Sequence, residues 1–390
     1  MRRVLWITGR LPYPLRSGDA LYTAGLVQAA HAAGYSVTVI GLARTPDLSI
    51  DQLKSVADVE WRPVRSKPRH PLGSLLSTLP KDAYCLYPSG FRLELGTLLA
   101  REWDWIVLDH ARSAGALDQA LAGRDSRIAY VAHNVEQKVR REVAAGMGTN
   151  LVRAPYVVDA GKYCRLERKL VRAAASVIAI TAEDANDFRL DGAAAFHVPP
   201  VYLGPKTGKR VLDSSVPRRV MLLGSFDWVA KQSNLIRFLD NVGTRLVAAG
   251  VGIDIVGSIP HRLRDRLQKT YPGVDFRGSV DDVCAIAQNV RCGVIPEELG
   301  GGMKMKTLDY IFMRVPIFSL PSGVIGLPSD VRSAVFTAAS FAELGDALLR
   351  YIDDPQELDA RQSRAFEASD RRFCVEEAAA GLRLALDNQA

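Results

Sequence analysis

The sequence predicts an α/β protein of two doubly wound parallel-sheet domains. The chain has 390 residues, which is too long for one compact core and suits two domains of ordinary size. Short apolar strands alternate with amphipathic helices, a pattern typical of a parallel sheet with helices on both faces. The alternation is interrupted by a polar, Pro/Gly-rich segment at residues 197–209 and then starts again. We therefore expect two similar domains joined near residue 205.

The elements expected in the first half follow this alternation in order. A first apolar run leads into a helix with apolar residues at helical spacing, and Gly34 ends that helix before the second strand. The expected strands are residues 4–8, 36–40, 105–108, 128–131 and 177–181, and the expected helices are 19–33 and 159–174.

The second half repeats the pattern. Its expected strands are residues 220–223, 252–256, 274–276, 292–295 and 316–319, with a helix over 234–249. One further amphipathic helix is expected over residues 373–386. In open α/β sheets, ligands bind at the carboxyl ends of the strands, so loops at those ends are the first place to look for a site.

Composition excludes several classes of protein. Apolar residues make up 48% of the chain and charged residues 24%, which rules out disordered, collagen-like and fibrous proteins. The five cysteines are scattered without a C-x-x-C pair, which favours reduced thiols in a cytoplasmic protein over a disulfide framework. No metal site is predicted, since the histidines form no H-x-x-x-H pair. The net charge of +7 favours anionic partners such as nucleotide phosphates, anionic lipid or nucleic acid.

Two basic segments refine the choice of partner. Residues 61–70 form the first segment. The second consists of basic residues spaced for one helix face, with Glu167 as a possible ion-pair partner: Lys162, Arg165, Arg168, Lys169 and Arg172. Solvated faces are the simpler interpretation, and contact with an anionic membrane or acceptor is the alternative. Nucleic acid is not expected, because aromatic residues are not interleaved with these charges. The N-terminal apolar run is too short for a signal peptide, and no uninterrupted run of 18 apolar residues exists.

The stretch from Leu299 to Asp309 is the most informative candidate site. Three glycines before a helix let the backbone approach a ligand, and the helix dipole favours a negative charge there. Lys304 and Lys306 add charges suited to a diphosphate. Asp309, one turn into the helix, is placed to accept hydrogen bonds from ribose hydroxyls. The alternative is a turn followed by a solvated, lysine-rich face.

Two loops after expected strands are further candidates. The loop over residues 11–19 leads into a helix and can present backbone N–H groups to an anion, or else Gly18 only permits the turn while Ser17 or Asp19 caps the helix. His133 and Glu136 follow the strand at 128–131, and His110 follows the strand at 105–108; each also has an ordinary structural interpretation.

Missing motifs narrow the chemistry. The first loop lacks the G-x-G-x-x-G fingerprint of nicotinamide binding, and no G-x-x-x-x-G-K-[ST] sequence of a P-loop NTPase occurs. No two aspartates stand at D-x-D spacing, so the metal–diphosphate motif common in single-domain sugar transferases is absent.

Taken in order, these segments resemble the GT-B glycosyltransferases of the GT4-like group, the glycosyl transferases group 1. The similarity covers most of the chain. It consists of the opening loop and Gly34, the His-Asn-Val-Glu turn at 133–136, the segments 163–170 and 178–184, the landmarks at 224–228, 255–257 and 276–280, and the run from 301 to 309 with Pro316 and residues 323–327.

The resemblance implies a fold and a reaction. Two Rossmann-like domains would face each other across a cleft: an acceptor-side domain over residues 1–204 and a nucleotide-sugar domain over 205–370, with a helix over 371–390 packing back on the first. Such enzymes retain anomeric configuration without a metal, need no cofactor, and use the nucleotide-diphosphate sugar as donor substrate. The departing phosphate oxygen helps to take the proton of the acceptor hydroxyl, while cations and a helix N-terminus stabilise the leaving diphosphate.

The resemblance also implies roles for individual residues. His133 would contact the sugar, and Lys231 and Lys306 would hold the diphosphate, with His133 and Lys306 as the catalytic pair. The other donor-binding positions would be Gly18 near the phosphate, Ser279 and Val280 at the nucleobase, Asp309 at the ribose, and Gly301, Gly302, Met303 and Lys304 in the glycine-rich loop.

Two alternatives to a transferase stay open, and departures from the family pattern favour the second of them. Gly301 stands where the family often has its first Glu, Asp309 replaces the second, and Glu297 or Glu298 is the candidate substitute. A nucleotide-sugar epimerase of the same fold is one alternative. A weakly catalytic nucleotide-sugar-binding subunit of a polysaccharide assembly system is the other. For a transferase we expect a cytoplasmic protein, with peripheral contact at the inner face of the membrane through residues 62–70 as a further hypothesis.

Overall fold

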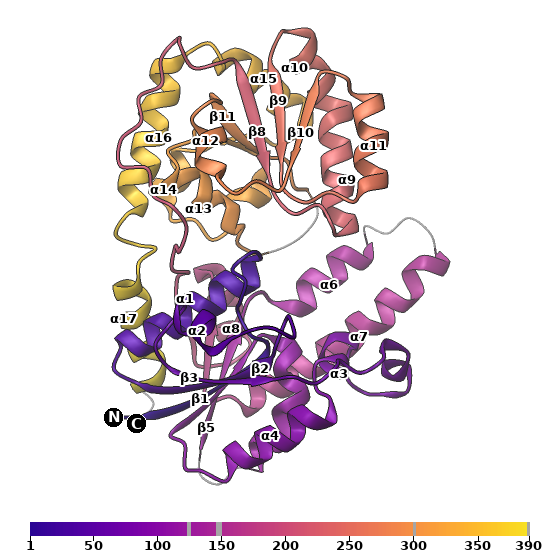
Figure 1. The fold of residues 1–390 in the computed structure, drawn as a ribbon, viewed down its shortest axis with the longest axis vertical. Helices are drawn as coiled ribbons and strands as arrows, with labels where there is room; N and C mark the ends of the chain where they lie inside the picture. The colour runs from indigo at the N-terminus through magenta and orange to yellow at the C-terminus, as the bar shows by residue number, and fades with distance from the viewer. Residues whose placement is uncertain (123–125, 146–149, 299–301, 388–390) are drawn as a thin grey trace. The chain divides into compact units, whose positions relative to one another are not determined.

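The computed structural model describes residues 1–122, 126–145, 150–298 and 302–387 and divides into two compact units (Figure 1). The first unit comprises residues 1–203 and 373–390, and the second comprises residues 204–372. Each has a parallel sheet with helices on both faces, so the predicted fold class of two doubly wound domains is confirmed. Within the described residues, no helix is both long enough and apolar enough to cross a membrane.

The sheet of the first unit has the order β3-β2-β1-β4-β5-β6-β7, and every pairing in it is parallel. The strands are β1 Arg3–Arg10, β2 Ser36–Leu42, β3 Glu60–Val64, β4 Trp105–Asp109, β5 Arg127–Ala132, β6 Ser176–Ala179 and β7 Ala195–His197. The helices are α1 Gly18–Ala32, α2 Ile50–Lys54, η1 Pro71–Leu76, α3 Lys81–Cys85, α4 Ser89–Leu99, η2 Ala111–Ala116, α5 Leu117–Leu121, α6 Glu136–Ala145, α7 Asn150–Ala173, α8 Ala182–Leu190 and α17 Val375–Asp387.

The sheet of the second unit has the order β10-β9-β8-β11-β12-β13 and is also parallel. Its strands are β8 Arg219–Leu223, β9 Gly252–Val256, β10 Val274–Gly278, β11 Cys292–Ile295, β12 Ile317–Ser319 and β13 Phe336–Thr337. Its helices are α9 Val229–Phe238, the π-helical turn η3 Leu239–Gly243, α10 Thr244–Ala248, α11 His261–Thr270, α12 Val283–Ala287, α13 Met305–Phe312, η4 Pro321–Val324, α14 Ser329–Ser333, α15 Phe341–Tyr351 and α16 Pro355–Ser369.

Each unit has its own apolar core. Strand residues such as Leu5, Ile106 and Tyr130 are fully buried in the first, and Val220, Ile253 and Phe318 are fully buried in the second. The long apolar runs of these strands follow from burial on both faces of a parallel sheet. The C-terminal helix α17 packs on α1 within the first unit, and Arg2 donates a hydrogen bond of 2.6 Å to its Leu386 carbonyl.

Among the departures from the sequence predictions are the strands β3, β7 and β13, which were not predicted, and the starts of two helices. Residues 60–64 form the edge strand β3, which the sequence analysis assigned only as part of a basic segment. Pro63 obscured this strand, yet proline is tolerated at a sheet edge. Helix α7 begins nine residues before the predicted start at 159, and the helix predicted at 234–249 begins at Val229 and passes through a π-helical turn.

Candidate functional site

The strand order places one topological switch point in each unit. In the first unit, β1 lies between β2 and β4, and in the second unit β8 lies between β9 and β11. At such a point, the chain leaves two neighbouring strands toward opposite faces of the sheet. A crevice therefore opens at the carboxyl ends of these strands. Of the predicted site residues, His133 lies in the loop after β5, and Gly302, Met303 and Lys304 lie between β11 and α13. Lys231, Lys306 and Asp309 lie on the helices that follow β8 and β11.

His133 follows β5 and is held by Asp109 at the end of β4. Its Nε2 lies 2.6 Å from Asp109 Oδ1, and the Trp6 indole N–H donates to Asp109 Oδ2 at 2.8 Å. Asp109 is fully buried, and His133 is 8% exposed. The Tyr22 ring packs edge-on against the imidazole, with 5.0 Å between centroids. One carboxylate oxygen of Asp109 contacts the Trp6 indole, and the other contacts the His133 imidazole. These contacts therefore fix the orientation of His133.

A second imidazole and carboxylate lie beside this pair. His110 Nε2 is 3.6 Å from Glu136 Oε1, and Arg140 Nε donates to Glu136 Oε2 at 2.8 Å. The rings of His110 and His133 are 4.8 Å apart. Burial, followed by the charge of Arg112, lowers the pKa of His110 well below its ordinary value. A backbone φ of +71° at His110, rare for a residue with a side chain, marks the sharp turn that brings the two histidines together.

Gly18 begins helix α1, and the adjacent Asp19 forms an ion-paired cluster. Ser17 occupies the N-cap position without accepting a hydrogen bond from the helix backbone. Asp19 Oδ2 instead lies 2.8 Å from Arg112 and 3.3 Å from Arg44. Burial alone would raise the pKa of Asp19, but the charges of Arg112 and Arg44 hold it well below its ordinary range. The alternative in which Ser17 or Asp19 caps the helix is therefore not what the structure shows.

Glu167 forms no ion pair with the basic residues of its own helix that the structure describes, so that expectation is wrong. It is 2% exposed, and its carboxylate accepts hydrogen bonds from the backbone N–H groups of Glu136 at 2.9 Å and Gln137 at 3.0 Å. It therefore caps the N-terminus of α6, directly after the His133 loop. Burial raises the pKa of Glu167 to about 7, although the two backbone hydrogen bonds oppose this shift.

The raised pKa of Glu167 predicts that the first unit loses stability as the pH rises. The folded-state pKa of about 7 lies above the ordinary value of 4.5, so the folded protein binds the extra proton between these values. The free energy of unfolding then falls as the pH rises through this window, by up to about 3 kcal/mol for such a shift. Urea unfolding followed by tryptophan fluorescence measures the loss, because Trp6, Trp61, Trp103 and Trp105 lie in this unit.

Glu167→Gln is the matched variant for this experiment. It removes the titrating group, so the pH dependence of stability between these two values becomes shallower than in the wild type. Parallel curves for the two proteins would show that Glu167 does not titrate in this range.

In the second unit, Lys306 lies at the switch point. It stands in the first turn of α13, and its ammonium forms an ion pair with the buried Glu297 that follows β11. The ammonium also lies close to the turn after β8, since a Cβ built on Gly224 would be 3.8 Å from Lys306 Nζ. Glu297 Oε2 is buried and has no hydrogen-bond partner among the described residues.

Tyr310 anchors helix α13 to strand β8. Its hydroxyl accepts a hydrogen bond from the Leu223 N–H at 2.8 Å and donates to the Met221 carbonyl at 3.0 Å. Thr307 Oγ1 donates to the Gly323 carbonyl at 3.0 Å. Tyr310 lies one turn after Lys306, so its bonds to β8 fix where the Lys306 side chain stands relative to the end of that strand.

The loop after β8 forms a small polar cluster near Lys231. The hydroxyls of Ser225 and Ser258 each donate to Asp227 Oδ2 at 2.6 Å. These hydrogen bonds lower the pKa of Asp227, and the charge of Lys231 on α9 contributes in the same direction. Gly257 permits the close approach of the loops after β8 and β9: its φ is +125°, and a Cβ built on it would clash with the Gly224 carbonyl oxygen.

The remaining predicted residues lie in or beside the same loops. Gly302 has a φ of +72°, Met303 is buried, and Lys304 Nζ donates to the Gly302 carbonyl at 3.1 Å. Asp309 is half-buried on α13, and Ser279 and Val280 follow β10. Gly301 lies outside the described residues.

The structure thus distributes the predicted site over both units. Gly18 and His133 belong to the first unit; Lys231, Ser279, Val280, Gly302, Met303, Lys304, Lys306 and Asp309 belong to the second. Sequence reasoning missed Asp109 as the partner of His133. An aspartate at the end of an otherwise apolar strand was the available signal, since a buried carboxylate requires a partner.

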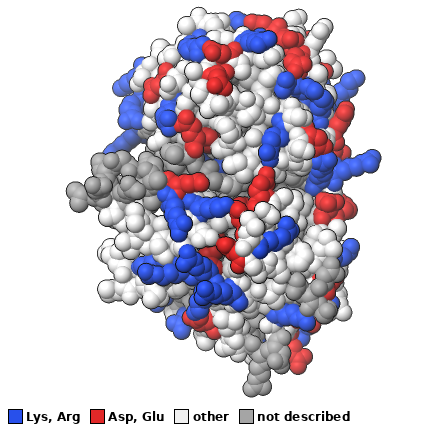
Figure 2. Space-filling model, turned by 180° about the vertical axis from the view of Figure 1, so that it is seen from behind, with Lys and Arg blue, Asp and Glu red and all other residues white. Residues whose placement is uncertain are grey.

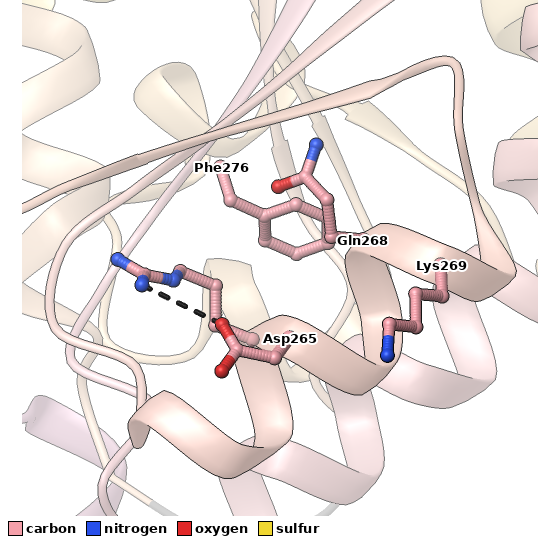
Figure 3. Close-up of a pocket in the computed structure, with 5 residues that line it drawn as sticks. Asp265, Gln268, Lys269 and Phe276 are labelled. Carbon is pink, nitrogen blue, oxygen red and sulfur yellow. Dashed lines mark ion pairs between the residues drawn. The ribbon is translucent and has the colours of Figure 1, made fainter.

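One surface pocket in the second unit contains none of the predicted residues. It is lined by Arg264, Asp265, Gln268, Lys269 and Phe276, and Figure 3 shows these side chains extending from α11 and β10. The dashed line in that figure marks the ion pair between Arg264 and Asp265, whose nearest atoms are 3.5 Å apart. This pocket lacks buried polar groups that would select a ligand, so we do not assign the site there.

In the comparison with protein-family models, the match lies in the second unit. Residues 217–354 match the family model of the glycosyl transferases group 1. This segment contains β8, β11 and α13, the elements that carry Lys231, Glu297 and Lys306. None of the curated proteins matches the sequence.

The comparison with solved structures identifies the fold of the whole chain. Sucrose-phosphate synthase from Thermosynechococcus elongatus has a TM-score of 0.73 at 15% identity, covering 100% of this chain and 99% of that one. Anabaena HepE in complex with UDP and glucose has a TM-score of 0.67 at 14% identity, with 100% of both chains covered. WaaG, a glycosyltransferase involved in lipopolysaccharide biosynthesis, has a TM-score of 0.67 at 14% identity, with 98% and 99% covered. The chain has the GT-B fold, and the predicted resemblance to GT-B glycosyltransferases is confirmed.

Proposed function

We propose that this chain transfers a sugar from a nucleotide-diphosphate donor to an acceptor hydroxyl, with retention of anomeric configuration and without a metal ion. The observation that carries the proposal is the position of Lys306: at the β8/β11 switch point, in the first turn of α13, within the segment that matches the glycosyl transferases group 1. The bond between the anomeric carbon and the diphosphate oxygen breaks, and a bond to the acceptor oxygen forms. The acceptor proton passes to the departing diphosphate.

The residues of the second unit fit the diphosphate role. The ammonium of Lys306 and the N-terminal end of α13 both place positive charge where the leaving group gains negative charge. The charge of Lys231 extends this environment to the loop after β8. The acceptor class stays a proposal: a saccharide, a lipid-linked saccharide or a natural product.

A nucleotide screen tests the proposal. We expect one of UDP, GDP, dTDP, ADP and CMP to raise the melting temperature by several degrees, because a ligand at about 100 times its Kd stabilises the folded state by about 2.7 kcal/mol. The shift should be unaffected by EDTA and absent with the matching nucleoside, which lacks phosphates. If none of the five nucleotides raised the melting temperature, that result would contradict the donor site. A shift that requires a divalent cation would contradict metal independence.

The departure at Gly301 favours a second candidate, a weakly catalytic nucleotide-sugar-binding subunit of a polysaccharide assembly system. Without a glutamate at that position, the glutamate beside Lys306 is Glu297, whose carboxylate is already ion-paired with it. Tight binding of a nucleotide sugar with no transfer to any acceptor would favour this candidate. Turnover of the nucleotide sugar without an acceptor would instead indicate an epimerase.

A further inference from the structure

The first unit exposes six large apolar side chains in two neighbouring segments, which we call the apolar ridge. Three leucines stand on η1 and three residues stand near the start of α7. Their exposed fractions are 65% for Leu72, 71% for Leu75, 98% for Leu76, 45% for Tyr156, 49% for Val157 and 59% for Val158. Single exposed apolar residues are common, but a group of this size marks a binding surface.

Two hydrogen bonds hold the segments of the ridge side by side. Lys162, one turn after Val158 on α7, donates from Nζ to the Ser74 carbonyl of η1 at 2.7 Å. Asp159 Oδ1 accepts from the Lys81 N–H at the start of α3 at 2.8 Å. In Figure 1 the coil between β3 and α3 lies beside α7, in agreement with these contacts.

The leucines face outward because the polar side of η1 is tied inward. Ser74 is buried, and its hydroxyl donates to the Pro71 carbonyl at 2.6 Å. Gly73 packs closely against the Tyr84 ring, and Arg69 stacks on the same ring at 4.2 Å. The usual arrangement is thus reversed, with a serine inside and leucines in solvent, and the lost burial of the leucines has no compensation within the described residues.

The charge beside the ridge is mainly positive, although Asp82 and Asp159 also lie next to it. Residues 65–81 contain Arg65, Lys67, Arg69 and Lys81 and no acidic residue. Farther along α7, exposed basic residues follow the ridge: Arg165, Arg168, Lys169 and Arg172. Figure 2 shows Lys and Arg side chains gathered together on one part of the first unit.

We propose that the apolar ridge docks on an anionic lipid bilayer. The leucines of η1 and the apolar residues of α7 enter the boundary between headgroups and acyl chains, and the flanking lysines and arginines contact the headgroup phosphates. A bilayer suits this surface better than a second copy of the chain, because a symmetric interface would bring like charges face to face. The inference does not rest on the proposed sugar transfer. It differs from the initial membrane hypothesis in placing the main contact on η1 and α7, since residues 60–64 belong to strand β3 and Arg62 pairs with Glu60.

Vesicle co-sedimentation of the full chain tests the proposal. We expect binding to vesicles of phosphatidylcholine with phosphatidylglycerol and much weaker binding to phosphatidylcholine alone. The variant Leu72→Ser/Leu75→Ser/Leu76→Ser should bind the anionic vesicles at least about tenfold more weakly, because it removes the inserted apolar area and no charge. The variant Arg65→Gln/Lys67→Gln should also bind more weakly and show less dependence on salt.

Leu93→Ser/Leu190→Ser is the matched control, since these leucines are 74% and 78% exposed and lie outside the ridge. It should bind the vesicles as the wild type does. Wild-type protein that ignores anionic vesicles, or a triple variant that binds them unchanged, would overturn the proposal. A concentration-dependent dimer that the triple variant loses would do the same and assign the ridge to self-association. Melting temperatures of all variants establish that they are folded, and no donor or acceptor enters the assay, so its outcome is separate from that of the proposed reaction.

Discussion

Lys306→Ala lowers the turnover of the donor by about 10²- to 10³-fold, which is the usual effect of removing one group that stabilises developing negative charge. The ammonium lies between the turn after β8 and the carboxylate after β11, where a diphosphate leaving group would gain charge. Release of nucleoside diphosphate from the donor identified by the nucleotide screen measures the rate.

The control separates lost catalysis from lost stability. Lys306→Ala by itself strands the buried carboxylate of Glu297, and an uncompensated buried charge costs about 3–5 kcal/mol. The double variant Lys306→Ala/Glu297→Gln removes that charge, so we expect its stability to recover while its turnover stays low. A single variant that turns over at the wild-type rate would contradict the role of Lys306 without contradicting sugar transfer itself.

Asp109→Ala lowers the free energy of unfolding of the first unit by about 2–6 kcal/mol, because each of two buried polar groups left without its hydrogen-bond partner costs about 1–3 kcal/mol. Asp109 is fully buried, and its loss leaves both the Trp6 indole N–H and His133 Nε2 without their acceptor. Urea unfolding followed by tryptophan fluorescence measures the loss, and one of the tryptophans of this unit, Trp6, contacts Asp109.

Two further variants calibrate this result. Asp109→Asn keeps an oxygen for Trp6 and should cost less, about 1–3 kcal/mol. Asp118→Ala removes an exposed carboxylate that pairs with Lys169 and should change stability by less than about 1 kcal/mol. Equal stabilities of the Asp109→Ala and Asp118→Ala proteins would contradict a structural role of the Asp109–His133 pair.

The sequence predicted the strands near the site better than the elements around it. The apolar runs that became β1, β4, β8 and β11 have the continuous hydrophobicity of strands buried on both faces, so they were recognised to within a few residues. The edge strand β3 was missed because Pro63 interrupts its pattern. The first turns of α7 were missed because Tyr156, Val157 and Val158 are all exposed there and follow no helical periodicity.

The sequence by itself determined the fold class and the positions of His133 and Lys306 after strands. Those conclusions depend on local periodicity and on the turns that end each element, which short segments encode. The sequence could not decide whether Glu297 or Glu298 substitutes for the glutamate that the family often has at position 301. The structure pairs Glu297 with Lys306 of α13 and Glu298 with Arg237 of α9, so the packing of these two helices beside the segment after β11 decides between the two glutamates. Likewise, only the tertiary structure joins Asp109 to Trp6, 103 residues away, because the packing of β1 against β4 brings their side chains together.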